Sequence, residues 1–319
     1  MAGIGHKDQH WVPRTYLNAW CDPECPVLYT PFVHVFRNDG TPIGRRAPHN
    51  LFTENNLYTI TGVEGVRDLR LERGFSTIED EFSRLRPKIE RREELSVEEA
   101  GWLLAFVAAA HVRTPRMRDH DAMQYGHMLK VMDDMQAAMD RMSSEEKRRF
   151  AKAQPPKTEG PSFSHEQVRR MAAQPLQETM FPKLVAELKA FAAANMKLGI
   201  LYHDLEPGFV TSDMPCVWID PENANRPPVL RGVGVGSKTT EITLPITPKA
   251  MVILSHRAEL EGYVPAPNLW VQEMNRRTVY HSKEFVTNRA VVNPFWLLDD
   301  DDVFAAFGMR PPQRWEDKA

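Results

Sequence analysis

A run of apolar residues between two polar ends constrains the fold of this chain more than any other stretch. Residues 101–110, GWLLAFVAAA, carry no charged or strongly polar side chain. Ser96 precedes this run and Glu99 follows three residues later, which is the spacing of a helical capping box. A helix that is apolar on all sides is buried on all sides, and these ten residues are too few to span a bilayer. We therefore expect a buried central helix that delivers His111 and Arg113 at its end.

The composition narrows the class of protein. The 319 residues are 42% hydrophobic and 26% charged, which is ordinary for a globular chain of one large or two modest domains. The formal net charge of -3 does not suggest a general nucleic-acid binder. Three cysteines at irregular spacings argue against a disulfide framework, and we expect no secretion signal and no membrane-spanning segment. We expect a cytoplasmic protein without a membrane partner.

The N-terminal half predicts a hairpin followed by helices. Residues 33–46 alternate apolar side chains and then carry Asn38-Asp39-Gly40, which is typical of a β-hairpin turn. Residues 56–61 predict another short strand. Apolar residues then recur at helical spacing from residue 75 to residue 89. Residues 120–151 are also helical in pattern and rich in Met, which we interpret as adaptable packing against a neighbouring helix.

The C-terminal half changes its pattern from helix to strand. Residues 166–195 are helical in pattern, and the later apolar runs are short and bounded by Pro, Gly and Asp. These runs predict strands at residues 198–203, 208–211, 217–219, 241–245 and 250–255. Helices are expected at residues 270–280 and 299–307.

This order of elements predicts an α+β fold. Helices and strands are segregated along the chain instead of alternating, so a doubly wound βαβ sheet is not expected. We expect a central helical layer with an N-terminal β-hairpin and a C-terminal set of short, mainly antiparallel strands. The chain is predicted to form a single domain over residues 1–319. Within it, residues 154–165 predict a hinge between residues 1–153 and residues 166–319, because they are rich in Pro, Gly and Ser.

Several phrases of the sequence together resemble a known family. They are QHWVPRTYLNAW, STIEDEF, HVRTPRMR, FVTSDMPCVW and ITLPITPK, and they occur in that order. The chain is similar to the domain-of-unknown-function 4238 family over roughly residues 8 to 290. This resemblance implies a domain and candidate positions, but no chemistry. The positions that match the family pattern are His10, Pro13, Tyr16, Leu17, Glu79, Arg113, Pro115, Ser212, Asp213 and Pro215.

Three of these positions are the main candidates for chemistry. His10 is a candidate general base, although an imidazole there can also anchor the N-terminus to a backbone carbonyl. Asp213 is a candidate acid, base or Mg²⁺ ligand, or else a side chain that caps backbone N–H groups in a turn. Arg113 can clamp an anionic ligand or form an ion pair with Glu79 of the preceding helix.

The other candidates support these three. Glu79 is assigned with His10 and Asp213 as catalytic, while Tyr16 and Arg14 are assigned with Arg113 to substrate binding. Cys21 and Cys25 hint at a zinc site, but a second ligand pair is missing, so no metal ligands are assigned. The cofactor is unknown, and a divalent metal is kept only as an alternative.

Two further motifs are given structural interpretations. The Gly-rich residues 232–239 do not match a phosphate-binding loop, because the Lys is out of place and a strand follows. Cys216 is interpreted as a small residue buried in a strand.

Three functions remain open at this point, and whether the chain is an enzyme is uncertain. The first is a hydrolase of a phosphoester, with His10 as base, Asp213 and Glu79 as acid or metal ligand, and Arg113 as anion clamp. The second is a non-catalytic module that binds a small ligand or a protein, with the same residues in a buried polar network. The third is a nucleic-acid binder, although the sequence has no strong signature for it. The partner is unknown, and a small anionic ligand is the class considered first.

Overall fold

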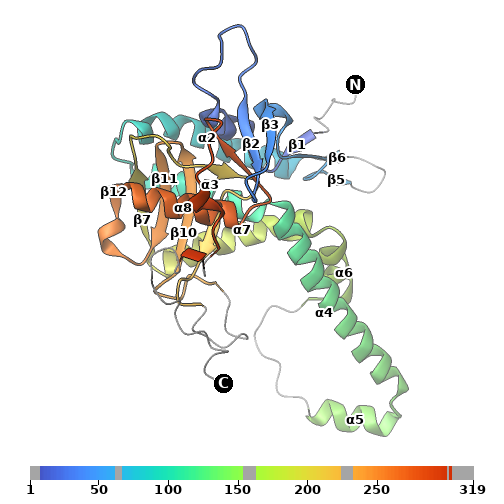
Figure 1. Ribbon diagram of the computed structural model, residues 1–319. Helices are drawn as coiled ribbons and strands as arrows, with labels where there is room; N and C mark the ends of the chain where they lie inside the picture. The colour runs from blue at the N-terminus through green and yellow to red at the C-terminus, as the bar shows by residue number, and fades with distance from the viewer. Residues whose placement is uncertain (1–7, 62–66, 154–162, 224–232, 300–301, 304–319) are drawn as a thin grey trace. The chain divides into compact units, whose positions relative to one another are not determined.

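The computed structural model describes residues 8–61, 67–153, 163–223, 233–299 and 302–303 (Figure 1). The chain forms two compact units, one of residues 1–114 with 183–319 and one of residues 115–182. The single domain and its division at residues 154–165 stay predictions, since residues 154–162 lie outside the described ranges. No helix among the described residues is long and apolar enough to cross a membrane.

The central helix of the first unit is α3 (Val97–Val112). The predicted capping box is confirmed, because Ser96 Oγ accepts from the Glu99 amide at 3.2 Å and the Ser96 amide donates to Glu99 Oε2 at 2.7 Å. Every residue from 105 to 110 is buried, whereas Trp102 and Leu104 are half-buried. The helix is therefore enclosed over its C-terminal half and partly open near its start.

Helix α2 (Arg70–Glu90) packs against α3 through aromatic rings. The rings of Phe82 and Phe106 stack with centroids 3.8 Å apart. The predicted apolar stripe is the buried face of α2, with Phe75, Phe82, Leu85 and Ile89 buried and Ile78 half-buried. The periodicity of the sequence thus identifies the face of α2 that meets α3.

Two sheets complete the first unit, and the α+β prediction is confirmed. The five-stranded sheet has the order β12 (Gly262–Pro265), β7 (Lys197–Tyr202), β11 (Ala250–Ser255), β10 (Glu241–Thr247) and β9 (Val217–Ile219). Its β12–β7 pair is parallel, and the other pairs are antiparallel. The other sheet is antiparallel, in the order β3 (Pro42–Arg46), β2 (Val33–Arg37), β13 (Glu284–Thr287) and β8 (Thr211–Ser212).

One helix and two short strand pairs are added to these sheets. Helix α8 (Asn268–Tyr280) contributes Val271 and Met274 to a core with Leu201, Met251 and Ile253 of the five-stranded sheet. The short pairs are β1 (Asp8–His10) with β4 (Thr53–Asn55), and β5 (Ile60–Thr61) with β6 (Arg67–Asp68).

The strand predictions succeed where the signal is local. The hairpin of β2 and β3 is confirmed, with Gly40 at φ +83° in its turn. The strands β9 and β11 have the predicted bounds. The strand predicted at residues 56–61 is wrong over most of its length, because Asn56 adopts a left-handed turn at φ +57° and only residues 60–61 are extended. The helix predicted at 299–307 lies largely outside the described residues.

The second unit consists of helices. They are α4 (Pro115–Arg141), α5 (Ser144–Ala153), α6 (His165–Ala173) and the start of α7 (Pro175–Ala193). The single helix predicted over residues 166–195 is interrupted at Gln174, since the following Pro175 disfavours a helical conformation there. Helix α4 packs against α6, yet Met128 and Met135 of its Met-rich stripe are exposed. The predicted packing is therefore not observed for these two residues.

The N-terminal segment joins elements that are far apart in the sequence. The Tyr16 hydroxyl, on α1 (Arg14–Leu17), lies 2.6 Å from Thr211 Oγ1 of β8 and donates to the Pro245 carbonyl of β10 at 2.7 Å. The Trp20 indole donates to the Phe209 carbonyl at 2.9 Å. Tyr16 and Trp20 are fully buried. This segment thus links one strand of each large sheet.

Replacement of Tyr16 by Phe tests that link. Tyr16→Phe removes only the hydroxyl and leaves the buried Pro245 carbonyl without its donor, so the free energy of unfolding should fall by about 1–3 kcal/mol. Urea denaturation measures the change. Tyr29→Phe is the matched control, since Tyr29 is 69% exposed. Equal effects of the two substitutions would contradict the role assigned to Tyr16.

Candidate functional site

Strand β1 places His10, and the neighbouring Gln9 fixes that strand. The Gln9 amide nitrogen donates to Thr59 Oγ1 at 3.2 Å and to Glu72 Oε2 at 3.0 Å, while its oxygen accepts from the Tyr58 amide at 2.6 Å. The Tyr58 hydroxyl donates to the His10 carbonyl at 3.1 Å. Because Gln9 is buried and bonded on both sides, the backbone at His10 is held in one position.

A pocket of about 400 Å³ opens beside His10. His10, Arg14 and Glu79 all line it, so the structure brings three of the predicted site residues together. Its wall also includes Tyr58 and Phe75 and the acidic residues Asp8 and Glu72.

Arg113 lies behind the Glu79 side of this pocket. It follows the last turn of α3, and its side chain is 1% exposed. Its Nη1 donates to Glu79 Oε1 at 2.7 Å, and its guanidinium carbon lies 5.6 Å from the centre of the Phe75 ring. Of the two alternatives raised by the sequence, the structure therefore shows the ion pair. Among the described residues, Arg113 Nε and Nη2 have no hydrogen-bond partner.

His10 presents a free nitrogen in these surroundings. Its Nε2 is buried and has no hydrogen-bond partner within the part of the chain that the structure describes. Burial lowers the pKa of the ring below its ordinary value of 6.5, while the Glu79 charge opposes that shift and the Arg14 charge adds to it. The imidazole is thus neutral at pH 7 and can accept a hydrogen bond or a proton.

Asp213 lies outside the residues that line this pocket. It follows β8, and its Oδ1 accepts from the backbone amides of Lys283 at 3.1 Å and Glu284 at 3.4 Å. This is the capping alternative that the sequence left open. The Trp11 indole donates to the Asp213 carbonyl at 3.0 Å, so the backbone of Asp213 contacts the segment that carries His10. Burial raises the pKa of the carboxyl to about 6. A catalytic role for Asp213 stays a prediction.

The two other residues assigned to substrate binding differ in burial. Arg14 is exposed at the mouth of the pocket. Tyr16 is buried with its hydroxyl bonded to protein groups, so its assignment to substrate binding stays a prediction that this placement does not support. The sequence did not identify Gln9, Tyr58 or Glu72. Gln9 stands next to His10 in a family-like phrase, which is the one signal that pointed to it.

No metal centre is found among the described residues, where no group of three or more His, Cys, Asp or Glu side chains could hold a metal ion. Cys216 is buried, and burial raises the pKa of its thiol. Cys216 therefore lacks the thiolate character of a nucleophile.

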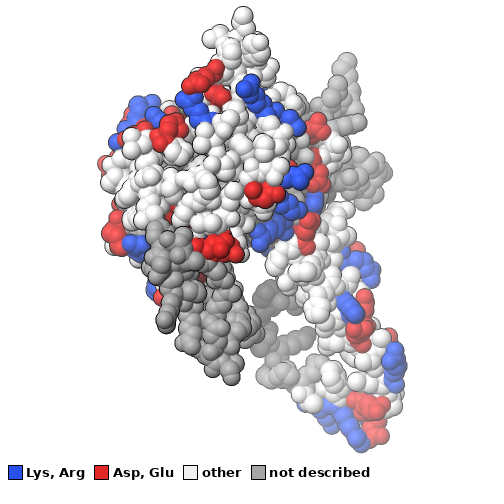
Figure 2. Space-filling view, in the orientation of Figure 1, with Lys and Arg blue, Asp and Glu red and all other residues white. Residues whose placement is uncertain are grey.

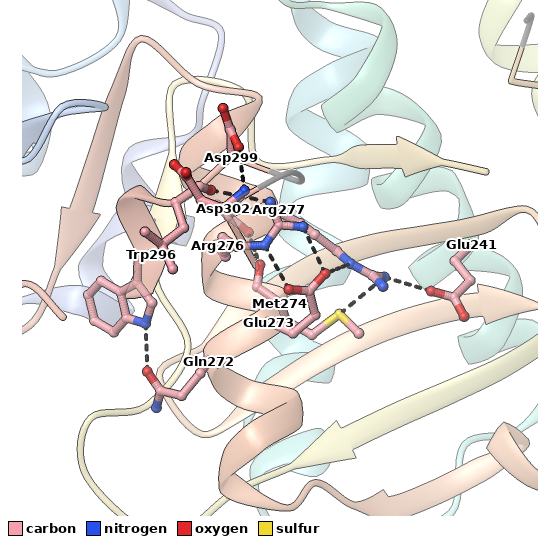
Figure 3. A network of polar contacts seen from close by, with 11 residues as sticks. Glu241, Gln272, Glu273, Met274, Arg276, Arg277, Trp296, Asp299 and Asp302 are labelled. Carbon is pink, nitrogen blue, oxygen red and sulfur yellow. Dashed lines mark hydrogen bonds and ion pairs between the residues drawn. The ribbon is translucent and has the colours of Figure 1, made fainter. Parts of the chain in front are cut away.

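A second polar cluster lies on α8 (Figure 3). Glu273 accepts from Arg276 Nε at 2.7 Å and from Arg277 Nε at 2.8 Å, and Arg277 Nη1 donates to Glu241 at 2.6 Å. These residues adjoin a pocket of about 320 Å³. Because each of these carboxylates is paired with a guanidinium, we interpret the cluster as an ion-pair network that fixes α8 on the sheet.

Comparison with known proteins identifies a family. The family model DUF4238, described as a protein of unknown function, matches residues 8–290. No curated protein and no solved structure matches the chain significantly.

The pKa of Asp213 predicts a dependence of stability on pH. The folded state binds this proton more tightly than the unfolded chain, whose Asp pKa is about 3.9. The contribution of Asp213 is therefore present at pH 4 and is lost as the pH rises through about 6. The loss is up to about 3 kcal/mol.

Thermal unfolding from pH 4 to pH 8 tests this dependence. Asp213→Asn keeps a side-chain oxygen for the two amides but cannot ionise, so its melting temperature should fall less over this range than that of the unmodified protein. Asp140→Asn, at an exposed site on α4, should follow the unmodified protein. Parallel curves for all three proteins would contradict the raised pKa.

Proposed function

Since this chain belongs to the DUF4238 family, whose function is unknown, we propose a function from the site itself: the protein binds a small polar molecule in the His10 pocket. The observation that carries this proposal is the buried His10 Nε2, which has no hydrogen-bond partner among the described residues. Buried polar atoms are rarely left unbonded, so a ligand donor or a water molecule would satisfy it. The pocket of about 400 Å³ is large enough for a small molecule.

The charges of the wall favour a ligand with a cationic group. Among the described residues that line the pocket, Asp8, Glu72 and Glu79 supply carboxylates and Arg14 is the one guanidinium. Arg113 compensates Glu79 from behind. A small amine or guanidine compound can place its charge near Asp8 and Glu72 and donate a hydrogen bond to His10. This choice replaces the small anionic ligand that the sequence suggested first.

Hydrolysis of a phosphoester is the second candidate, and Arg14 is the observation that favours it. Arg14 is exposed at the pocket mouth and forms no ion pair among the described residues, so it can contact a phosphate oxygen. Neutral His10 would then take a proton from the attacking water. The metal-assisted form has less support, because the described residues offer no ligand set. The cytoplasmic location and the nucleic-acid alternative stay predictions.

Binding measurements with two kinds of probe separate these candidates. We expect agmatine to bind the unmodified protein in calorimetry, and His10→Ala to weaken that binding at least tenfold, or about 1.4 kcal/mol. His120→Ala is the control, because His120 is exposed on α4. Hydrolysis of bis(p-nitrophenyl) phosphate that is lost in His10→Ala, with an unchanged melting temperature, would favour the hydrolase. Absence of both agmatine binding and hydrolysis would contradict a functional site at His10.

A further inference from the structure

An apolar loop projects between the short helix η1 (Asn18–Trp20) and strand β2. Residues 26–31, PVLYTP, contain no charged side chain. Val27 is 100% exposed, Leu28 is 97% exposed and Tyr29 is 69% exposed. Figure 1 shows the loop extending beyond the strands of the hairpin, and Figure 2 shows a tip without Lys, Arg, Asp or Glu. Single exposed apolar residues are common, but three in succession at the end of a projecting loop indicate a contact surface.

The base of this loop is held in place by hydrogen bonds. The Asp22 amide donates to the Phe32 carbonyl at 2.8 Å, which closes the two ends of the loop. Within the loop, the Tyr29 amide donates to the Pro26 carbonyl at 2.8 Å and forms a turn. Pro26 and Pro31 restrict the backbone on both sides of the tip. The apolar side chains are thus presented on a preorganised turn, which lowers the entropy lost on binding.

Positive charges that are unpaired among the described residues lie at the base of the loop. Arg45 and Arg46 of β3 lie beside the start of β2, and the Arg45 guanidinium carbon is 4.8 Å from the centre of the Phe32 ring. Both arginines are exposed, and within the described ranges neither has a carboxylate partner. The acidic groups nearby are already paired, Asp22 with His34 and Glu24 with Arg289.

We propose that this loop inserts into the interface of a bilayer that contains anionic lipids. The loop presents aliphatic and aromatic side chains, and β3 adds cationic side chains at its base. A bilayer presents acyl chains, the interface and phosphates in the same order. Val27 and Leu28 enter the acyl boundary, Tyr29 lies at the headgroups, and Arg45 and Arg46 attract lipid phosphates. This contact needs no spanning helix, but it departs from the expectation, drawn from the sequence, that the protein has no membrane partner. It is independent of the His10 pocket.

Vesicle flotation of the full chain tests the proposal. Vesicles of phosphatidylcholine with 30% phosphatidylglycerol should bind the protein, and vesicles of phosphatidylcholine alone should bind it more weakly. Higher salt should weaken the binding, because it screens the arginine–phosphate attraction. The double variant Val27→Asp, Leu28→Asp should bind at least tenfold more weakly. Arg45→Gln with Arg46→Gln should reduce both the binding and its salt dependence.

A matched control and one further measurement keep the test decisive. Leu269→Asp with Val291→Asp introduces the same two charges at residues that are each 56% exposed and lie outside the loop, and this variant should bind vesicles like the unmodified protein. Circular dichroism confirms that each variant is folded. The proposal is overturned if the unmodified protein does not bind anionic vesicles, or if the Leu269→Asp, Val291→Asp variant loses binding equally. A dimer in light scattering that Val27→Asp, Leu28→Asp dissociates, without vesicle binding, would assign the loop to a second copy instead.

Discussion

The ion pair between Arg113 and Glu79 is the interaction on which the candidate site depends. Burying a guanidinium away from water costs free energy unless a carboxylate and further polar groups bond to it. Here one bond to Glu79, the face of the Phe75 ring and the C-terminal end of α3 compensate that charge. Phe75 and Glu79 are four residues apart on α2 and therefore share a face. The contact that buries Arg113 thus also orients the wall of the His10 pocket.

The N-terminal segment forms the other side of the pocket. Gln9 bonds to groups between β4 and β5 and on α2, Trp11 bonds to the backbone after β8, and Tyr16 reaches both large sheets. Each of these bonds joins residues that are at least 49 positions apart in the chain. A segment at the start of the chain is therefore tied to the core by several independent contacts, which is why His10 has a defined place.

Local patterns predicted the elements that depend on their own sequence. The capping box at Ser96, the stripe on α2 and the hairpin at Gly40 each follow from neighbouring residues, and all three are confirmed. The strands β1, β12 and β13 were not predicted. Each is short, and each is extended because it pairs with a strand that is distant in the sequence. Propensity gives little signal for strands of this kind.

The candidate site was predicted in part for the same reason. The phrases that carry the family resemblance led to His10 and Glu79, and the pocket contains both. The sequence could not tell whether Arg113 faces a ligand or Glu79, because the guanidinium uses the same N–H donors to bind either of them. It also could not show that β13 supplies the amides bonded by Asp213, because that pairing joins residues about 70 positions apart.

A double-mutant cycle on Arg113 and Glu79 tests the central claim most directly. Arg113→Met leaves Glu79, whose side chain is 26% exposed, without its guanidinium partner, and we expect it to lower the free energy of unfolding by about 1–3 kcal/mol. Glu79→Gln should also destabilise the protein, and the double variant should lose at least about 2 kcal/mol less than the sum of the two single effects. Effects that add to within about 0.5 kcal/mol would contradict the claim that this buried pair organises the site.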